Sequence, residues 1–227
     1  MPSGLSAPPA DPTGGLRRRV RLLLPLADAP EPEPRRGLRV GLLGGSFNPA
    51  HDGHRYASLQ ALKRLGLDQV WWLVSPQNPL KPRAGTAPLA ERLAVARRIA
   101  AHPRIKVLDL ERRLGTVYTV DLLRRLAAWR GYRFVLLIGA DNLAQLPRWR
   151  HWTELVQRVP IAVVDREPYS RAALAGVAAH RLAACRQEAE RARGLVDRVP
   201  PAWTFLRLRP HPASSTAIRA GLASPPG

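Results

Sequence analysis

The segment Gly41–His54 constrains the fold of this chain more than any other. The apolar run Leu38–Leu43 predicts a buried strand, and two glycines follow it directly. After a short polar turn, His51 and His54 open a segment with apolar side chains at helical spacing. Glycines let the backbone come close to a ligand, and the free N–H groups at a helix start point at an anion. The segment therefore predicts a phosphate site at a strand-to-helix turn.

The two histidines are the chemical groups at this turn. No Gly-Lys-Ser/Thr follows the glycines, so the turn is not a Walker loop, and the glycine spacing excludes the dinucleotide fingerprint. Because His51 and His54 are three residues apart, they can share one face of the first helical turn. Two imidazoles there can donate hydrogen bonds to phosphate oxygens and balance charge that develops on them. Helix capping, or half of a metal site, is the alternative.

The run Gly-Gly-Ser-Phe-Asn-Pro-Ala-His-Asp-Gly-His at residues 44–54 resembles the signature of the nucleotidyltransferases with a His-x-Gly-His motif. The residues of this motif are most similar to those of bacterial nicotinate-nucleotide adenylyltransferases. Near the other end, Ser-Ser-Thr-Ala-Ile-Arg at residues 214–219 matches the family's second signature, which binds the ATP phosphates. Taken alone, that segment equally fits a helix capped by Ser or Thr. The resemblance covers residues 38–222 and implies a Rossmann-like α/β fold with ATP at the first strand-to-helix turn.

Alternating strands and helices predict one α/β domain over residues 37–227, with a doubly wound parallel sheet. Ligands of such sheets bind beyond the carboxyl ends of the strands. After the first, strands are expected at Gln69–Val74, Arg104–Leu108, Tyr132–Ile138, Ile161–Val164 and Trp203–Leu208. Helices are expected at Pro88–Ala100 and Thr119–Trp129, and the Arg/Ala-rich stretch Tyr169–Arg193 predicts a solvated helix or two.

The composition disfavours a membrane-spanning or disulfide-bonded protein and favours one that binds anionic partners. Residues 1–36 are rich in Pro, Ala, Gly and Arg, and we expect them to be a disordered extension and linker. The formal net charge of +19 suits anionic partners, although the preference for arginine over lysine resembles a GC-rich coding bias. The one cysteine, Cys185, excludes a disulfide within the chain and fits a cytoplasmic setting. No apolar run is long enough for a transmembrane helix.

Three later strand ends carry polar side chains. Lys81 follows the second strand, where an ammonium can reach a polyphosphate; a solvated loop lysine is the alternative. The family often has a histidine where Leu80 stands. Gly139 and Asp141 end the fourth strand, and the carboxylate can bind sugar hydroxyls or water, or cap a helix. Arg166 ends the fifth strand, where it can approach a phosphate or form a surface salt bridge.

Two segments with aromatic residues are candidates for binding the second substrate. Thr119 is a reasonable N-cap for the helix that follows it. In the family, a similar Tyr-Thr segment meets the nicotinate end of the substrate, which implies this role for Tyr118 and Thr119. The family also carries a tryptophan that stacks near the pyridine ring at the position of Trp149, and Trp152 is expected in the core. Aromatic rings among arginines can equally bind single-stranded nucleic acid.

The resemblance implies adenylyl transfer from ATP to nicotinate mononucleotide, giving nicotinate adenine dinucleotide and pyrophosphate for NAD biosynthesis. Mg²⁺ is expected to be held mainly by the ATP phosphates, since no carboxylate cluster suggests a protein metal site. The expected catalytic residues are His51, His54, Lys81 and Arg219. The expected ATP-binding residues are Gly44, Gly45, Ser46, Phe47, His51, His54, Gly139, Asp141, Ser214, Ser215, Thr216 and Arg219. The expected substrate-binding residues are Ser46, Lys81, Tyr118, Thr119 and Trp149.

Three alternatives stay open at this point. The same chemistry can act on nicotinamide mononucleotide or on phosphopantetheine, although the Tyr118 and Trp149 regions argue against phosphopantetheine. A nucleic-acid-binding protein would explain the charge and the six tryptophans, and would bind DNA or RNA with a steep salt dependence. A nucleotide sensor would bind ATP without turnover. We expect ATP and nicotinate mononucleotide as partners, and neither a membrane nor nucleic acid.

Overall fold

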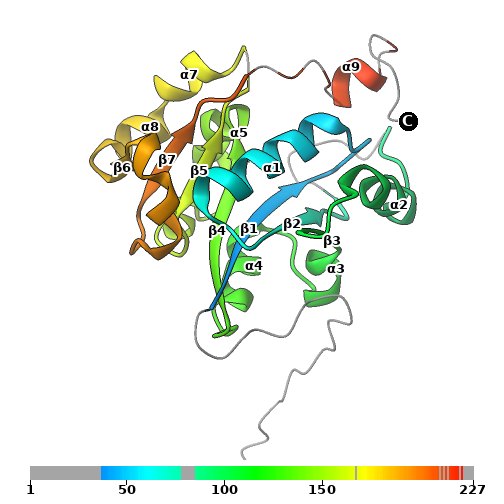
Figure 1. The fold of residues 1–227 in the computed structure, drawn as a ribbon, viewed down its shortest axis with the longest axis horizontal. Coiled ribbons are helices and arrows are strands. Elements are labelled where there is room, and N and C mark those ends of the chain that lie inside the picture. The colour runs from blue at the N-terminus through cyan, green and yellow to red at the C-terminus, as the bar shows by residue number, and fades with distance from the viewer. Residues whose placement is uncertain are drawn as a thin grey trace, which may run out of the picture.

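The computed structural model describes residues 37–77, 85–166, 168–209, 211, 213, 215–219 and 221. The expectations for residues 1–36, Leu80, Lys81 and Ser214 lie outside them. One seven-stranded sheet runs through the described chain in the order β3-β2-β1-β4-β5-β7-β6, and every neighbouring pair is parallel. Helices cover both faces of the sheet (Figure 1). This arrangement confirms the predicted doubly wound α/β fold.

The elements alternate along the chain as expected. The strands are β1 (Leu38–Gly45), β2 (Gln69–Val74), β3 (Ile105–Leu108), β4 (Tyr132–Gly139), β5 (Ile161–Val164), β6 (Arg186–Gln187) and β7 (Trp203–Leu206). The α-helices are α1 (Asp52–Leu65), α2 (Leu89–Ala100), α3 (Leu110–Leu114), α4 (Thr119–Leu126), α5 (Ala140–Gln145), α6 (Trp152–Leu155), α7 (Ser170–Leu174), α8 (Val177–Arg181) and α9 (Ser215–Arg219). Three 3-10 segments are η1 (Leu146–Arg148), η2 (Ala183–Cys185) and η3 (Ala189–Asp197).

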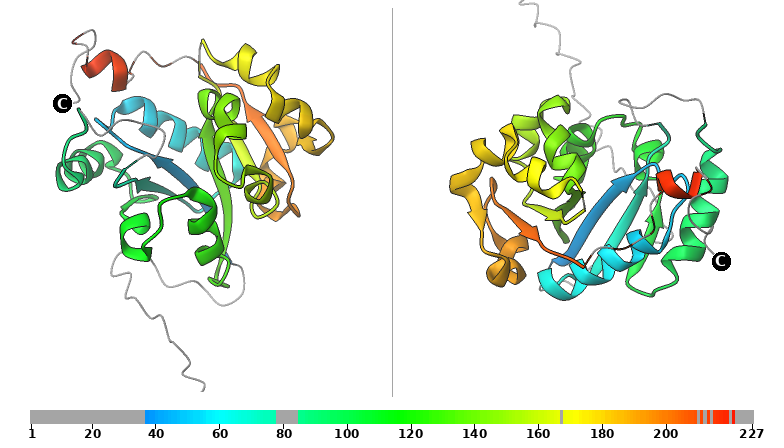
Figure 2. Two further views of the ribbon diagram at one scale, coloured as in Figure 1. Left: turned by 180° about the vertical axis from the view of Figure 1, so that it is seen from behind. Right: turned by 90° about the horizontal axis from the view of Figure 1, so that it is seen from above.

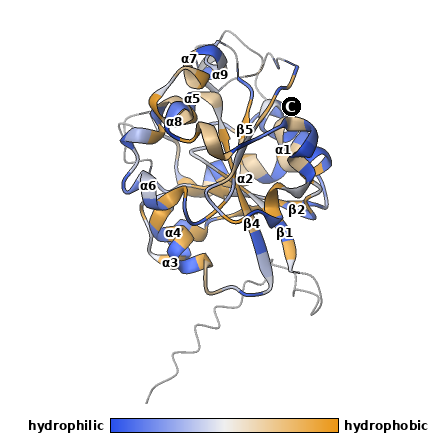
Figure 3. Ribbon diagram, turned by 90° about the vertical axis from the view of Figure 1, so that its left-hand side faces the viewer, coloured by the Kyte–Doolittle hydropathy of each residue, from blue (hydrophilic) through white to orange (hydrophobic). Residues whose placement is uncertain are grey.

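Two apolar clusters form the core, one on each face of the sheet. Helices α1 and α2 and segment η3 pack on one face, and α3 to α8 pack on the other (Figure 2). Parallel strands covered on both sides are apolar along their length, as β2 and β5 are. Figure 3 shows apolar residues concentrated in the strands and hydrophilic residues along much of α1. Among the described residues, no helix has the length and apolarity that crossing a membrane requires.

Several predicted boundaries were wrong by a few residues. Strand β1 continues through both glycines, because Gly44 and Gly45 pair with Leu73 and Val74 of β2. Helix α4 ends at Leu126 and not at residue 129, and β7 ends at residue 206 and not at 208. The N-cap of α4 is the residue before Thr119, in an extended conformation and without a side-chain cap, so the N-cap prediction for Thr119 was wrong.

The prediction for residues 169–193 differed most from the structure. It forms α7, α8, η2, the edge strand β6 and the start of η3 instead of a solvated helix or two. Four of its alanines, Ala173, Ala178, Ala179 and Ala192, are buried in the two core clusters. Alanine is too small and too weakly apolar to mark a buried face in a sequence rich in it, so hydrophobic periodicity could not reveal this packing.

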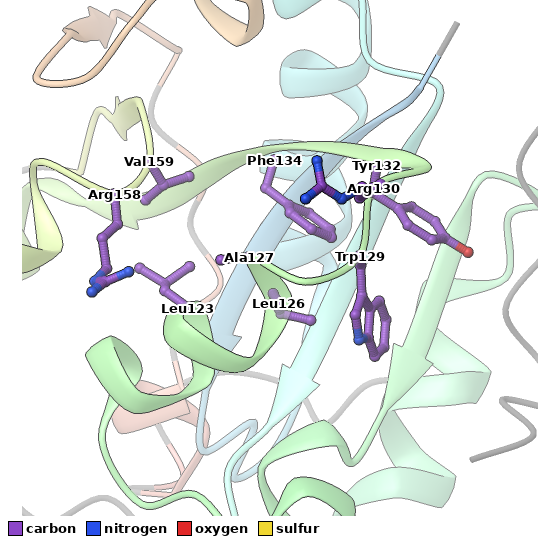
Figure 4. A pocket seen from close by; sticks show the side chains of 9 residues that line it. All are labelled: Leu123, Leu126, Ala127, Trp129, Arg130, Tyr132, Phe134, Arg158 and Val159. Carbon is purple, nitrogen blue, oxygen red and sulfur yellow. The ribbon is translucent and has the colours of Figure 1, made fainter. Parts of the chain in front are cut away.

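An aromatic cluster lies at the amino end of β4. Trp71 contacts Tyr132 and Trp129, with ring centroids 5.3 Å and 6.2 Å apart, and Tyr132 stacks on Phe134. Beside it is a pocket of about 350 Å³, which Figure 4 shows. None of the predicted site residues lines this pocket. The candidate site lies at the opposite, carboxyl end of the strands.

Candidate active site

The polar strand ends meet where the sheet reverses its order. Strand β1 lies between β2 and β4, and the chain runs outward through β2 and β3 before it crosses to β4. In such sheets the crevice beyond the carboxyl ends of the two central strands is the usual ligand site. Gly45 ends β1 and Gly139 ends β4. A Cβ atom at Gly44 would meet nothing within 4 Å, so open space lies beside this glycine.

The loop between β1 and α1 is fixed by an aromatic anchor. Phe47 has a positive φ of 47°, and its buried ring stacks on Trp72 and packs against His54, with centroids 5.0 Å and 4.8 Å away. Trp72 Nε1 donates to Ser58 Oγ at 2.7 Å, and Ser58 Oγ donates to the carbonyl oxygen of His54 at 2.8 Å. These contacts fix the first turn of α1 on the sheet, so the position of His54 is defined by core packing.

The two histidines lie side by side, as the three-residue spacing predicts. Their ring centroids are 3.9 Å apart. His51 is the N-cap of α1, and its backbone N–H donates to His54 Nδ1 at 3.2 Å, so the helix-capping alternative for this pair is confirmed. In a neutral imidazole only one nitrogen carries a proton, so the proton of His54 lies on Nε2. His51 is 5% exposed, and neither of its ring nitrogens has a partner in the part of the chain that the structure describes.

The pKa of each imidazole lies below its ordinary value, which favours the neutral form near pH 7. Burial lowers the pKa of His51 to about 4, with a further contribution from the charge of Arg166. The pKa of His54 lies well below its usual value, first because of burial and then because of the neighbouring His51. Unpaired polar nitrogens in a buried position are costly unless a ligand satisfies them. A bound anion would satisfy these nitrogens and would favour their protonated forms.

The second signature lies directly against the first. Ser215 Oγ of α9 donates to the carbonyl oxygen of Pro49 at 2.9 Å, across 166 residues of chain. Arg219 donates to the carbonyl oxygen of Asn48. A Cβ atom on Gly53 would lie 3.1 Å from the carbonyl oxygen of Ala213. The two motifs predicted to bind ATP phosphates therefore share one site.

Asp141 joins the site through Arg166. Its Oδ2 accepts a hydrogen bond from Arg166 Nη1 at 3.2 Å, and its Oδ1 is buried without a partner among the described residues. A side chain at Gly139 would collide with that Oδ1 atom. The N-cap of α5 is Gly139, so the alternative that Asp141 caps this helix is wrong. The arrangement leaves a carboxylate oxygen able to accept from a ligand hydroxyl.

The predicted acceptor residues lie on the α3–α4 loop and after η1. Tyr118 is half-buried, and the guanidinium carbon of Arg150 lies 4.8 Å from the centre of its ring. Trp149 and Trp152 are both half-buried against the same core cluster, so the structure does not separate them as the sequence prediction did. Thr116, which sequence reasoning missed, has a buried hydroxyl without a partner among the described residues.

The remaining predicted residues belong to α9, to the position directly before it and to the segment after β2. Thr216 lies in α9, while Lys81 and Ser214 fall outside the described residues. Within the described ranges, no cluster of three or more His, Cys, Asp or Glu could hold a metal ion. Sequence reasoning also missed Asn48 as a loop tie: its Nδ2 donates to Gly85 O at 2.8 Å, and its Oδ1 accepts from Ala87 N at 3.2 Å. The sequence signal for Asn48 was its position within the motif at residues 44–54.

Comparison with known proteins agrees with this geometry. The model of the cytidylyltransferase-like family matches residues 42–221. A probable nicotinate-nucleotide adenylyltransferase of Bradyrhizobium sp. (strain ORS 278) is 53% identical over 185 residues, which cover 80% of this chain and 95% of the relative. One of Parvibaculum lavamentivorans is 51% identical over 184 residues, covering 81% and 92%. The chain belongs to the nicotinate-nucleotide adenylyltransferase family.

Solved structures support the fold of this adenylyltransferase family member. The nicotinic acid mononucleotide adenylyltransferase of Plasmodium falciparum, complexed with NaAD, matches with a TM-score of 0.59 and 16% sequence identity over 84% of this chain and 86% of that chain. The same protein complexed with APC matches with a TM-score of 0.57, over 81% and 83%. The family and the Rossmann-like fold predicted from the sequence are thus confirmed.

Proposed function

We propose that this chain transfers the adenylyl group of ATP to nicotinate mononucleotide, forming nicotinate adenine dinucleotide and pyrophosphate in NAD biosynthesis. The observation that carries the proposal is the docking of the two signatures predicted to bind phosphates on each other, Ser215 on Pro49, in a chain of this family. One structural neighbour, the Plasmodium falciparum enzyme, is complexed with NaAD, the dinucleotide product of this reaction.

In the proposed reaction, a phosphate oxygen of nicotinate mononucleotide attacks the α-phosphorus of ATP in line. The bond from that phosphorus to the bridging oxygen breaks, and pyrophosphate leaves with the electron pair. The attacking phosphate is already ionised, so no general base is needed. The protein must hold two anions together and neutralise the charge that grows on the transferred group.

The residues of the two signatures would divide this work. His54 would donate from Nε2, and His51 from whichever ring nitrogen carries its proton, to phosphate oxygens of ATP, beside the N–H groups at the start of α1. Ser215 and Arg219 of α9, together with Lys81, would complete the cradle. Asp141 would accept from a ribose hydroxyl through Oδ1, which has no partner among the described residues. Mg²⁺ would arrive with ATP, bound to its phosphates, as part of the substrate.

The acceptor would lie toward Tyr118, Thr119 and Trp149. The half-buried rings offer a stacking surface for the pyridine, and Arg150 above the Tyr118 ring places a positive charge there. A positive charge favours the carboxylate of nicotinate over the amide of nicotinamide. The single Cys185 favours a reducing compartment, so a cytoplasmic location is part of this proposal.

The test is pyrophosphate release by the purified full chain with Mg²⁺ and ATP. Nicotinate mononucleotide, nicotinamide mononucleotide and phosphopantetheine are offered separately, and the products are identified by mass. We expect a strong preference for nicotinate mononucleotide. Preference for either other acceptor would replace the proposed substrate. Release with none of the three would overturn the reaction, and ATP binding without turnover would then favour a nucleotide sensor.

A further inference from the structure

Arg92 is an arginine in the core, whereas most of the other basic residues that the structure describes are exposed. It lies in the first turn of α2 and is only 3% exposed. Its guanidinium donates to four backbone carbonyl oxygens: Nε to Ala87 at 2.8 Å, Nη1 to Ser46 and to Ser75 at 2.7 Å each, and Nη2 to Pro76 at 3.0 Å. None of these four acceptors is a carboxylate.

These carbonyl groups come from three separate segments. Ser46 belongs to the loop after β1, Ser75 and Pro76 follow β2, and Ala87 precedes α2. Burial lowers the pKa of Arg92, yet a guanidinium stays protonated in proteins. A buried charge is tolerated only when it is well hydrogen-bonded, and the planar fork of arginine can meet several carbonyl groups at once. A lysine has neither the reach nor the fork for four separate acceptors.

The direction of these bonds bears on the phosphate site. The Ser46–Phe47 peptide is trans, so its N–H points away from the carbonyl that Arg92 holds. Arg92 therefore sets the orientation of the Phe47 N–H at the end of β1. From the other side, Asn48 ties the same loop to Gly85 and Ala87. The two ties hold the loop after β1 and the segments on either side of residues 78–84 in one arrangement.

We propose that Arg92 is a positioning residue for adenylyl transfer, which fixes the Ser46–Phe47 turn relative to the exit of β2. The proposal rests on the proposed function, because it concerns the geometry in which both anions are bound. Arg92 acts through the backbone and touches neither substrate. A shift of about 1 Å in such a turn costs about a hundredfold in rate.

The test compares Arg92→Lys and Arg92→Ala with Arg97→Ala, which removes an exposed arginine from the same helix. Near-ultraviolet circular dichroism and thermal melting give the folded fraction, and turnover is measured well below the melting temperature. We expect kcat per folded molecule to fall about a hundredfold in both Arg92 variants and to stay within about twofold of wild type in Arg97→Ala. Guanidinium ion at millimolar concentration should raise the kcat of Arg92→Ala about tenfold, and the same concentration of NaCl should not raise it.

A merely structural role makes a different prediction. If Arg92 only stabilises the fold, the variants melt at a lower temperature but keep the wild-type kcat per folded molecule, and this result would overturn the proposal. Should Arg92→Ala not fold, Arg92→Lys decides alone. If the wild-type chain makes no dinucleotide, the proposed function fails, and calorimetric binding of Mg-ATP then tests Arg92. Binding at least about tenfold weaker in Arg92→Lys than in Arg97→Ala supports positioning, and anything less contradicts it.

Discussion

The backbone N–H of His51 donates to Nδ1 of His54 at 3.2 Å, and this bond decides which nitrogen of His54 can serve a ligand. Because Nδ1 is an acceptor, the proton of the neutral ring is on Nε2. The low pKa of His54, caused first by burial, keeps the ring neutral in the free protein. The backbone N–H of the N-cap residue of α1 thus sets the tautomer of a side chain predicted to be catalytic, and Nε2 is left as the donor.

His54→Ala should lower kcat about a hundredfold or more, since the loss of one strong transition-state contact costs about 3 kcal/mol. Two further variants separate the two ring nitrogens. Gln at this position can place a donor near the position of Nε2, whereas Asn can only replace the acceptor at Nδ1. We therefore expect His54→Gln to retain more turnover than His54→Asn. Wild-type turnover in His54→Ala, or a higher rate with Asn, would contradict the role of Nε2.

Gly53→Ala should reduce turnover strongly while the fold persists. A Cβ atom at this position would lie 2.9 Å from both Cε1 and Nδ1 of His51 and 3.1 Å from the Ala213 carbonyl oxygen. The added methyl would push His51 and the segment before α9 away from each other. Gly194→Ala is the matched control, because nothing lies within 4 Å of a Cβ there. Steady-state rates and melting temperatures of both variants test this; equal rates would show that His51 moves aside without cost.

Much of the site followed from the sequence because its parts are local. A strand that ends in glycines, histidines three apart and a Ser/Thr-rich helix start each occupy one short segment with its own pattern. Because the carboxyl ends of parallel strands lie at one edge of the sheet, the polar residues that follow these strands were expected to lie together. The docking of Ser215 on Pro49 joins residues 166 apart, and it was expected only through the resemblance between both motifs and one family.

The parts that sequence reasoning missed depend on tertiary contacts without a local signature. Arg92 looks like one more arginine in a basic chain, although it sits three residues after Leu89 on the apolar side of its helix. The buried hydroxyl of Thr116 and the tie made by Asn48 depend on which loops meet. The burial of the alanines in α7 and α8 was not predicted, because alanine differs too little in hydrophobicity from its neighbours to give a clear helical periodicity.

His51 should make the free protein less stable in acid. Its pKa in the folded state is about 4 against 6.5 unfolded, so the unfolded chain binds more protons between these values, and stability rises with pH across that window. Relative to His51→Asn, the wild-type free energy of unfolding should fall by about 3 kcal/mol from pH 7 to pH 4. Urea unfolding of both proteins at several pH values measures the difference. A pH-independent difference would show that the His51 ring is solvated.

Glu111 should contribute the opposite slope. Burial raises the pKa of this carboxyl to about 6, and Ser75 donates a hydrogen bond to it. The folded state then binds more protons between pH 4.5 and 6, so this contribution to stability is lost as pH rises. Relative to Glu111→Gln, the wild-type free energy of unfolding should fall by about 2 kcal/mol from pH 4 to pH 7. The same urea titrations test it, and a rise in that range would contradict the buried position of the carboxyl.

Arg150 should contribute to the choice of acceptor. Its guanidinium carbon lies 4.8 Å from the centre of the Tyr118 ring, at the end of the site proposed for the pyridine. Arg150→Ala should raise the KM for nicotinate mononucleotide about tenfold, because a carboxylate loses a nearby cation, and should change the KM for nicotinamide mononucleotide by less than about threefold. Arg148→Ala, which removes an exposed arginine two residues earlier, is the control. Steady-state kinetics with both nucleotides decide the matter, since an equal rise for the two acceptors would mean that Arg150 only packs on Tyr118 and does not read the charge of the ring substituent.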